Sequence, residues 1–107
     1  MILDWMEEYG IAEGMITLGY EDLGPHTLGT TKYLEDGSAD VIIHERLRDF
    51  PLTRESVAWH EFCHAEHYIR TGTSDHHEYT FYLRLLRKPL LAAWDLIGAK
   101  IIFKLTA

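Results

Sequence analysis

The sequence predicts a single α+β domain, and three features indicate it. The chain has 107 residues, of which 47% are hydrophobic and 25% charged, enough for one modest core. Short runs rich in β-branched residues lie between residues 15 and 45, separated by glycine-containing turns. From residue 53 onward, apolar residues recur with the spacing of a helix. The sheet is therefore expected in the first half of the chain and most of the helix in the second.

One short helix and three strands are predicted in the first half. The helix covers residues 3–9 and ends at Gly10. The strands are expected at residues 15–18, 26–34 and 39–45. A turn at residues 35–38 joins the last two strands as a hairpin. Because turns connect all three strands, a three-stranded antiparallel sheet is the expected arrangement.

Three helices are predicted in the second half. The first begins at Thr53, a favourable N-cap, and ends at Gly72. Its core face is expected to contain Ala58, Phe62, Ala65 and Ile69. The opposite stripe, expected to lie off the core, contains Ser56, His60, His64 and His67. The second helix runs from residue 75 to Pro89, and the third covers residues 90–105.

The most informative motif is His60-Glu61-Phe62-Cys63-His64, inside the first of these helices. Residues four apart lie on one face of a helix, so His60 and His64 can bind one metal ion together. Glu61 lies one step round the helix, where its carboxylate can take a proton from a metal-bound water. This His-Glu-x-x-His spacing is the signature of zinc metalloproteases. The plainer alternative is a helix with two solvated or core histidines.

A catalytic zinc site needs a third protein ligand, and the next helix offers His76 and His77. Neighbours on a helix point about 100° apart, so only one of them is expected to face the metal. We prefer His77, which shares a face with Phe81 and Leu85, and His76 remains the alternative. His67 points along the first helix and is expected to be outside the ligand set or to face solvent.

Hydrolysis also needs a donor for the oxyanion and a place for the substrate. The candidate donors are Tyr68, Tyr79, Tyr82 and His44, and the sequence does not choose among them. The strand at residues 39–45 is expected to form the rim of the cleft, where an extended substrate would add as a further strand.

The net charge and the cysteine content indicate which partners and which cellular location to expect. The formal net charge of −7 argues against a nucleic-acid-binding surface. The single cysteine, Cys63, cannot form an internal disulfide and is expected to be buried. The first residues are acidic and do not resemble a signal peptide. A cytoplasmic location is therefore expected.

The last predicted helix is apolar on all sides. Its residues 90–105 are fewer than the roughly twenty that a membrane span requires. The chain is thus divided into a catalytic core, residues 1–89, and an apolar C-terminal segment, residues 90–107. This segment either packs as a core helix, docks over the cleft and restricts access to the metal, or exchanges with a second copy to form a homodimer.

Three segments together resemble a known family. A strand of the type Asp40-Val41-Ile42-Ile43-His44, the His60–His64 motif and then His77-Glu78-Tyr79-Thr80-Phe81 are similar to the minigluzincins, small zinc metallopeptidases of prokaryotes. The resemblance implies a minimal zincin-like domain with zinc bound by His60, His64 and His77, and with Glu61 as general base and acid. Some members of this family are held latent by their C-terminal segment, and the resemblance extends this expectation to residues 90–107.

The SprT-like proteases are a second resemblance, but Glu78 stands where they often have glycine. They also tend to carry basic DNA-binding parts, which this acidic chain lacks. The expected function is therefore a zinc metalloendopeptidase acting on a peptide or protein. The alternatives are a non-catalytic zinc-binding interaction module, with His67 or Cys63 closing the site, and a SprT-like, DNA-associated protease.

Overall fold

The computed structural model describes residues 1–74, 79–95 and 97, without the side chain of Tyr79. It confirms the α+β class. The elements follow the order α1 (Ile2–Glu8), β1 (Ile16–Glu21), β2 (Gly29–Tyr33), β3 (Ala39–His44), the 3-10 helix η1 (Glu45–Asp49), α2 (Pro51–Thr71) and α3 (Tyr79–Leu85). Residues 89–95 are also helical. No helix in the described part of the chain is long and apolar enough to cross a membrane.

The sheet is mixed, so the predicted antiparallel meander is wrong. Its strand order is β1-β3-β2, with β1 parallel to β3 and β2 antiparallel to β3. The predicted hairpin between β2 and β3 is present, and β1 pairs with the other edge of β3, which makes β3 the central strand. The physical reason is that Val41, Ile42 and Ile43 make β3 the most apolar strand, and the central position buries all three.

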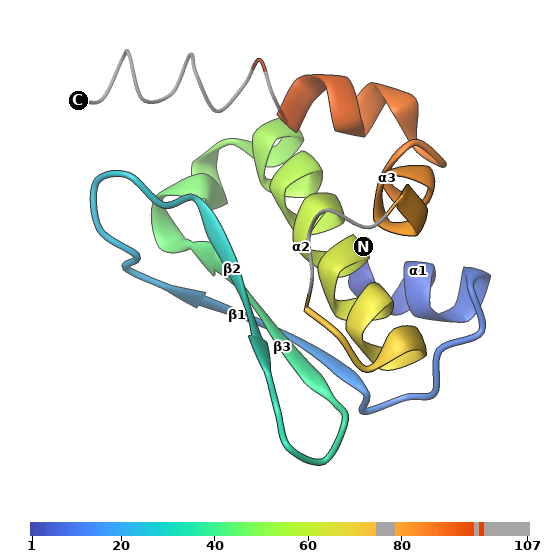
Figure 1. Ribbon diagram of the computed structural model, residues 1–107. Helices are drawn as coiled ribbons and strands as arrows, with labels where there is room; N and C mark the ends of the chain where they lie inside the picture. The colour runs from blue at the N-terminus through green and yellow to red at the C-terminus, as the bar shows by residue number, and fades with distance from the viewer. Residues whose placement is uncertain (75–78, 96, 98–107) are drawn as a thin grey trace.

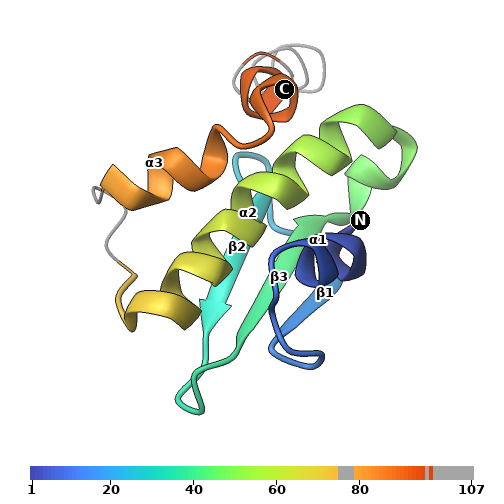
Figure 2. The same cartoon turned by 90° about the vertical axis from the view of Figure 1, so that its right-hand side faces the viewer.

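Helices cover one face of this sheet, as Figures 1 and 2 show. α2 runs across the sheet next to β2, and α1 lies beside it over β1 and β3. Between them is an aromatic core in which the Trp5 ring lies 5.2 Å from that of Trp59 and 5.5 Å from that of Phe62. α3 and residues 89–95 pack on the side of α2 away from the sheet. α2 therefore packs against the sheet and α1 on one side and against α3 and residues 89–95 on the other.

The observed ends of α2 agree only in part with those predicted from the sequence. Gly72 ends the helix in the left-handed conformation, with φ of 73°, as expected. The helix begins at Pro51 and has no side-chain cap, so Thr53 is not the N-cap. Proline at the first position already has a helical φ and no N–H that needs a partner, which makes a cap less necessary. Thr53 is instead buried, and its hydroxyl accepts a hydrogen bond of 3.0 Å from the indole of Trp94.

The predicted core face of α2 is confirmed, since Ala58, Phe62 and Ala65 are buried and Ile69 packs against them. The opposite stripe was expected to lie off the core, and for Ser56 and His67 this is wrong. His67 is 2% exposed, with the Phe81 ring of α3 centred 6.3 Å from its own. Periodicity in one helix does not reveal a second helix that covers it.

A buried carboxylate fastens α3 to α2. Glu66 is 1% exposed and forms ion pairs with Arg70, Arg84 and Arg87. The indole of Trp59 donates a hydrogen bond of 2.9 Å to the carbonyl of Leu85. The predicted helices at residues 75–89 and 90–105 fall partly outside the described residues. Within those residues they correspond to α3 and to the helical residues 89–95.

Candidate metal centre

His60 and His64 point their Nε2 atoms at each other from successive turns of α2. The two nitrogens are 3.0 Å apart, and both residues are half-buried. Two zinc–nitrogen bonds at a tetrahedral angle would place the ligand nitrogens about 3.3 Å apart. The donor type and spacing therefore fit a shared zinc ion. The histidine pair predicted from the sequence is thus brought together.

Glu61 points instead toward the sheet. Its Oε1 is 3.0 Å from the Thr31 hydroxyl of β2, and the residue is 9% exposed. Burial raises the pKa of Glu61, against the opposing effects of His60 and of the hydrogen bond from Thr31. A carboxylate with a raised pKa is a better proton acceptor near neutral pH.

The close approach of β2 to α2 depends on Gly29. A Cβ atom on this residue would lie 2.6 Å from Cγ1 of Val57 and 3.1 Å from Cγ of Glu61. Both distances are shorter than ordinary carbon–carbon contacts. The missing side chain of Gly29 thus leaves the space that the Glu61 side chain occupies.

Asp95 contacts the other nitrogen of His60. Its Oδ2 is 2.8 Å from Nδ1 of the imidazole, and the Asp95 side chain is 16% exposed. Burial lowers the pKa of His60, but the hydrogen bond and charge of Asp95, together with the charge of Glu61, raise it overall. The sequence interpretation did not single out Asp95. The available signal was the single acidic residue in the largely apolar segment 90–107.

The two histidines open into a cavity of about 360 Å³ between α2, α3 and residues 89–95. The lining residues are His60, His64, Phe81, Tyr82, Leu85, Ala92 and Asp95. The Phe81 ring stacks on that of His64, with centroids 4.1 Å apart and planes 10° apart. Apart from the two histidines, Asp95 and the hydroxyl of Tyr82, the lining side chains are apolar, which suits an apolar group of a ligand.

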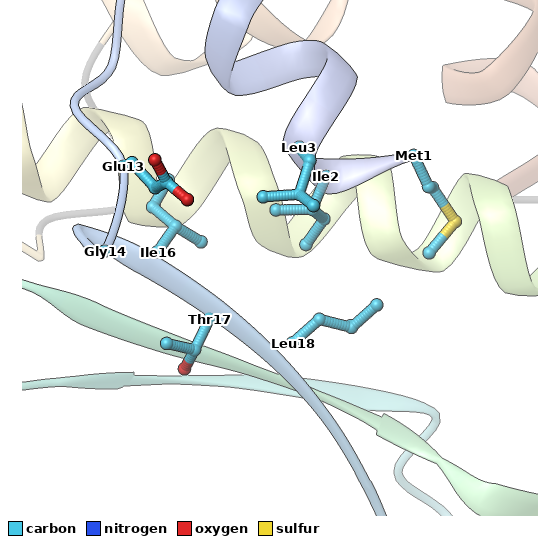
Figure 3. Close-up of a pocket in the computed structure, with 8 residues that line it drawn as sticks. All are labelled: Met1, Ile2, Leu3, Glu13, Gly14, Ile16, Thr17 and Leu18. Atoms are coloured by element: carbon cyan, nitrogen blue, oxygen red, sulfur yellow. The ribbon is translucent and has the colours of Figure 1, made fainter.

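A larger hollow of about 540 Å³ lies between α1 and β1, and Figure 3 shows its lining. Its walls are mainly aliphatic, including Leu3, Ile16 and Leu18, and Glu13 is at its edge. We assign the candidate site to the smaller cavity, because that one contains the facing imidazoles.

The third ligand predicted from the sequence, His77, lies outside the described residues, as does its alternative, His76. Among the residues that the structure does describe, no group of three His, Cys, Asp or Glu side chains is placed to hold a metal ion. His67 does not face solvent, and both its ring nitrogens lack a hydrogen-bond partner within residues 1–74, 79–95 and 97. Cys63 is in the hydrophobic core, where burial raises its pKa to about 12.

The candidate oxyanion donors lie in different parts of the structure. Tyr82 lines the cavity beside the histidines. The Tyr68 hydroxyl donates to the carbonyl of Leu34 at 2.8 Å, on the β2–β3 hairpin. His44 lies 2.9 Å from the Gly24 carbonyl through Nε2 and accepts from a backbone N–H through Nδ1. The side chain of Tyr79 is outside the description, so Tyr82 is the described candidate at the site.

The expectation that β3 forms the rim of the cleft is wrong, because strands pair with both of its edges. β2 is the edge strand that lies next to Glu61.

Comparison with protein-family models, curated proteins and solved structures finds no match to this chain. The resemblance to the minigluzincins rests on the motif residues and remains a prediction.

Proposed function

We propose that the protein is a zinc-dependent metallopeptidase that hydrolyses peptide bonds. The observation that carries this proposal is the facing pair of Nε2 atoms on His60 and His64, 3.0 Å apart beside an open cavity. Glu61, the next residue on the same helix, supplies the carboxylate that such chemistry needs. His77 is the proposed third ligand.

Bound zinc would supply a water of lowered pKa and polarise the substrate carbonyl. Glu61 would accept the proton of the attacking water and return it to the leaving amine. Burial raises the pKa of Glu61, which makes its carboxylate a better proton acceptor in the first step. The hydrogen bond from Thr31 would keep this carboxylate in one orientation.

The substrate would bind along β2 as an extended peptide. One edge of β2 pairs with β3, and the other edge has no strand partner among the described residues. Thr31 of β2 contacts Glu61 of α2, so an added strand would pair with the strand that makes this contact. The apolar wall formed by Phe81, Leu85 and Ala92 would receive a hydrophobic side chain, and the Tyr82 hydroxyl would donate to the oxyanion.

We also propose that the C-terminal segment limits access to the site. Ala92 and Asp95 line the cavity, and Trp94 attaches the segment to Thr53 of α2. Truncation after Pro89 should then increase peptide cleavage if zinc is retained. Leu90 and Ile97, 85% and 54% exposed, provide apolar surface through which a second copy could bind as a homodimer, which sedimentation would detect.

We place the protein in the cytoplasm, which the single buried thiol of Cys63 supports.

The test of the proposed activity is the substitution Glu61→Gln. The amide keeps the size of the side chain but cannot accept the proton of the water. Zinc content should match that of the wild type, and cleavage of a fluorogenic peptide library should be lost. Zinc in both proteins with cleavage in neither would instead identify a non-catalytic zinc-binding module.

A further inference from the structure

We propose that Asp95 is a positioning residue for the metal centre, which holds the His60 ring so that Nε2 is free to bind the metal. This inference rests on the proposed role of His60 and His64 as ligands. It concerns a residue that lies 35 positions from His60 in the sequence and on a different helical segment.

The geometry determines which nitrogen of His60 carries the proton. A neutral imidazole has one N–H donor and one acceptor nitrogen. A carboxylate can only accept, so the 2.8 Å contact with Oδ2 of Asp95 requires the proton on Nδ1. Nε2 of His60 then keeps its lone pair and faces Nε2 of His64. A metal ligand needs exactly this tautomer, with the lone pair directed into the site.

The position of Asp95 suits this role and not that of a ligand. Its carboxylate contacts the nitrogen of His60 that does not face His64. Carboxylates that accept from the second nitrogen of a ligating histidine fix its orientation and increase its basicity.

The segment that carries Asp95 is attached to the core by residues just before the contact. Ala92 is 7% exposed, and Trp94 donates its indole N–H to Thr53 at 3.0 Å. Phe81 and Leu85 give the cavity apolar walls, and a hydrogen bond to a charged group is stronger in such surroundings than in water. Residues 89–95 would therefore contribute to the metal centre as well as covering it.

Residues 89–95 would therefore have two opposing effects on peptide cleavage, because they limit access to the site and also support zinc binding. If it only limits access, its removal leaves zinc affinity unchanged and increases cleavage. If Asp95 also orients His60, its removal weakens zinc binding. Single substitutions at Asp95 separate these effects, because they leave the remaining residues of the segment in place.

The experiment compares Asp95→Ala and Asp95→Asn with Leu90→Ala as the control. Leu90 lies on the same helical segment and is 85% exposed, so its replacement leaves the carboxylate of Asp95 and the hydrogen bond of Trp94 in place. Zinc dissociation constants are measured by chelator competition. The tautomers of His60 and His64 are read in the zinc-free protein from long-range nitrogen–proton NMR correlations, with circular dichroism as a check of folding.

We expect Asp95→Ala to weaken zinc binding by about 10–100-fold, and Asp95→Asn to weaken it less, because its amide oxygen still accepts from Nδ1. Leu90→Ala should leave the zinc dissociation constant within a factor of about two of the wild-type value. In the zinc-free wild type, His60 should carry its proton on Nδ1 and His64 on Nε2, and Asp95→Ala should abolish this preference at His60. Unchanged zinc affinity and an unchanged tautomer in both Asp95 variants would overturn the inference.

The NMR measurement does not depend on zinc. If the wild type binds no zinc, the proposed function fails, whereas the tautomer of His60 still decides whether Asp95 orients the ring.

Discussion

Thr31 of β2 and Glu61 of α2 are joined by a hydrogen bond of 3.0 Å between the hydroxyl and the carboxylate. The same hydroxyl lies 3.1 Å from the backbone carbonyl of Glu61, so the strand contacts both the side chain and the helix backbone at one residue. An edge strand is thereby connected directly to the residue that we propose as the catalytic base. The position of β2 and the orientation of Glu61 depend on each other.

Glu61→Gln should stabilise the zinc-free protein at neutral pH. Burial raises the pKa of Glu61 above its ordinary value of 4.5, so ionisation destabilises the folded state. The stability gained from the protonated carboxyl is fully present below pH 4.5 and is lost as the pH rises through the folded pKa. Glutamine is neutral at every pH and can still accept from Thr31.

Thermal unfolding with a chelator present should therefore give a higher Tm for Glu61→Gln than for the wild type at pH 7. The two proteins should converge when the pH is lowered below 4.5. A lower Tm for the variant at pH 7 would show that the ionised carboxylate stabilises this fold.

Gly29→Ala should disturb both the fold and the candidate base. The new methyl group would lie 2.6 Å from Cγ1 of Val57 and 3.1 Å from Cγ of Glu61, so these side chains or β2 must shift. Overpacking of this kind costs about 1–3 kcal/mol in free energy of unfolding. Urea unfolding measures the cost, and peptide cleavage should fall as well, because Glu61 is displaced.

Gly19→Ala is the matched control, since it places the same methyl group on β1 with no atom within 4 Å. Its free energy of unfolding should equal or slightly exceed that of the wild type. Equal losses in the two variants would mean that close packing at Gly29 is not the cause.

His67→Leu should increase stability without affecting zinc binding. Both ring nitrogens of His67 are buried and lack a hydrogen-bond partner among the described residues. Such unsatisfied groups cost about 1–3 kcal/mol each, and leucine removes them while filling similar space. Urea unfolding should show a gain on the order of 1 kcal/mol. A loss of stability, or of zinc, would show that His67 has a partner after all.

The sequence was sufficient for the local features of this chain. His60 and His64 share a face of any regular helix because they are four residues apart. The turn at residues 35–38 joins two strands that are neighbours in the sequence. Each depends on residues close together in the chain, for which sequence patterns are informative. The α+β class, the end of α2 at Gly72 and its core face follow from the same kind of pattern.

The sequence was not sufficient where distant segments meet. Local signals locate β1, β2 and β3 but do not state which strand pairs with which, so the central position of β3 was missed. The contact of Asp95 with His60 and the covering of His67 by α3 are of the same kind. In these last two cases a later part of the chain packs against α2, and the periodicity of α2 carries no information about that contact.

The central claim is that His60 and His64 bind zinc together, and zinc titration of single-histidine variants tests it most directly. Isothermal calorimetry should give one zinc per wild-type chain, and His60→Ala, His64→Ala and His77→Ala should each weaken binding by more than about tenfold. Asp22→Ala, a substitution at an exposed acidic residue away from the cavity, is the control and should leave binding unchanged. Wild-type zinc affinity in a chain that lacks both His60 and His64 would contradict the account.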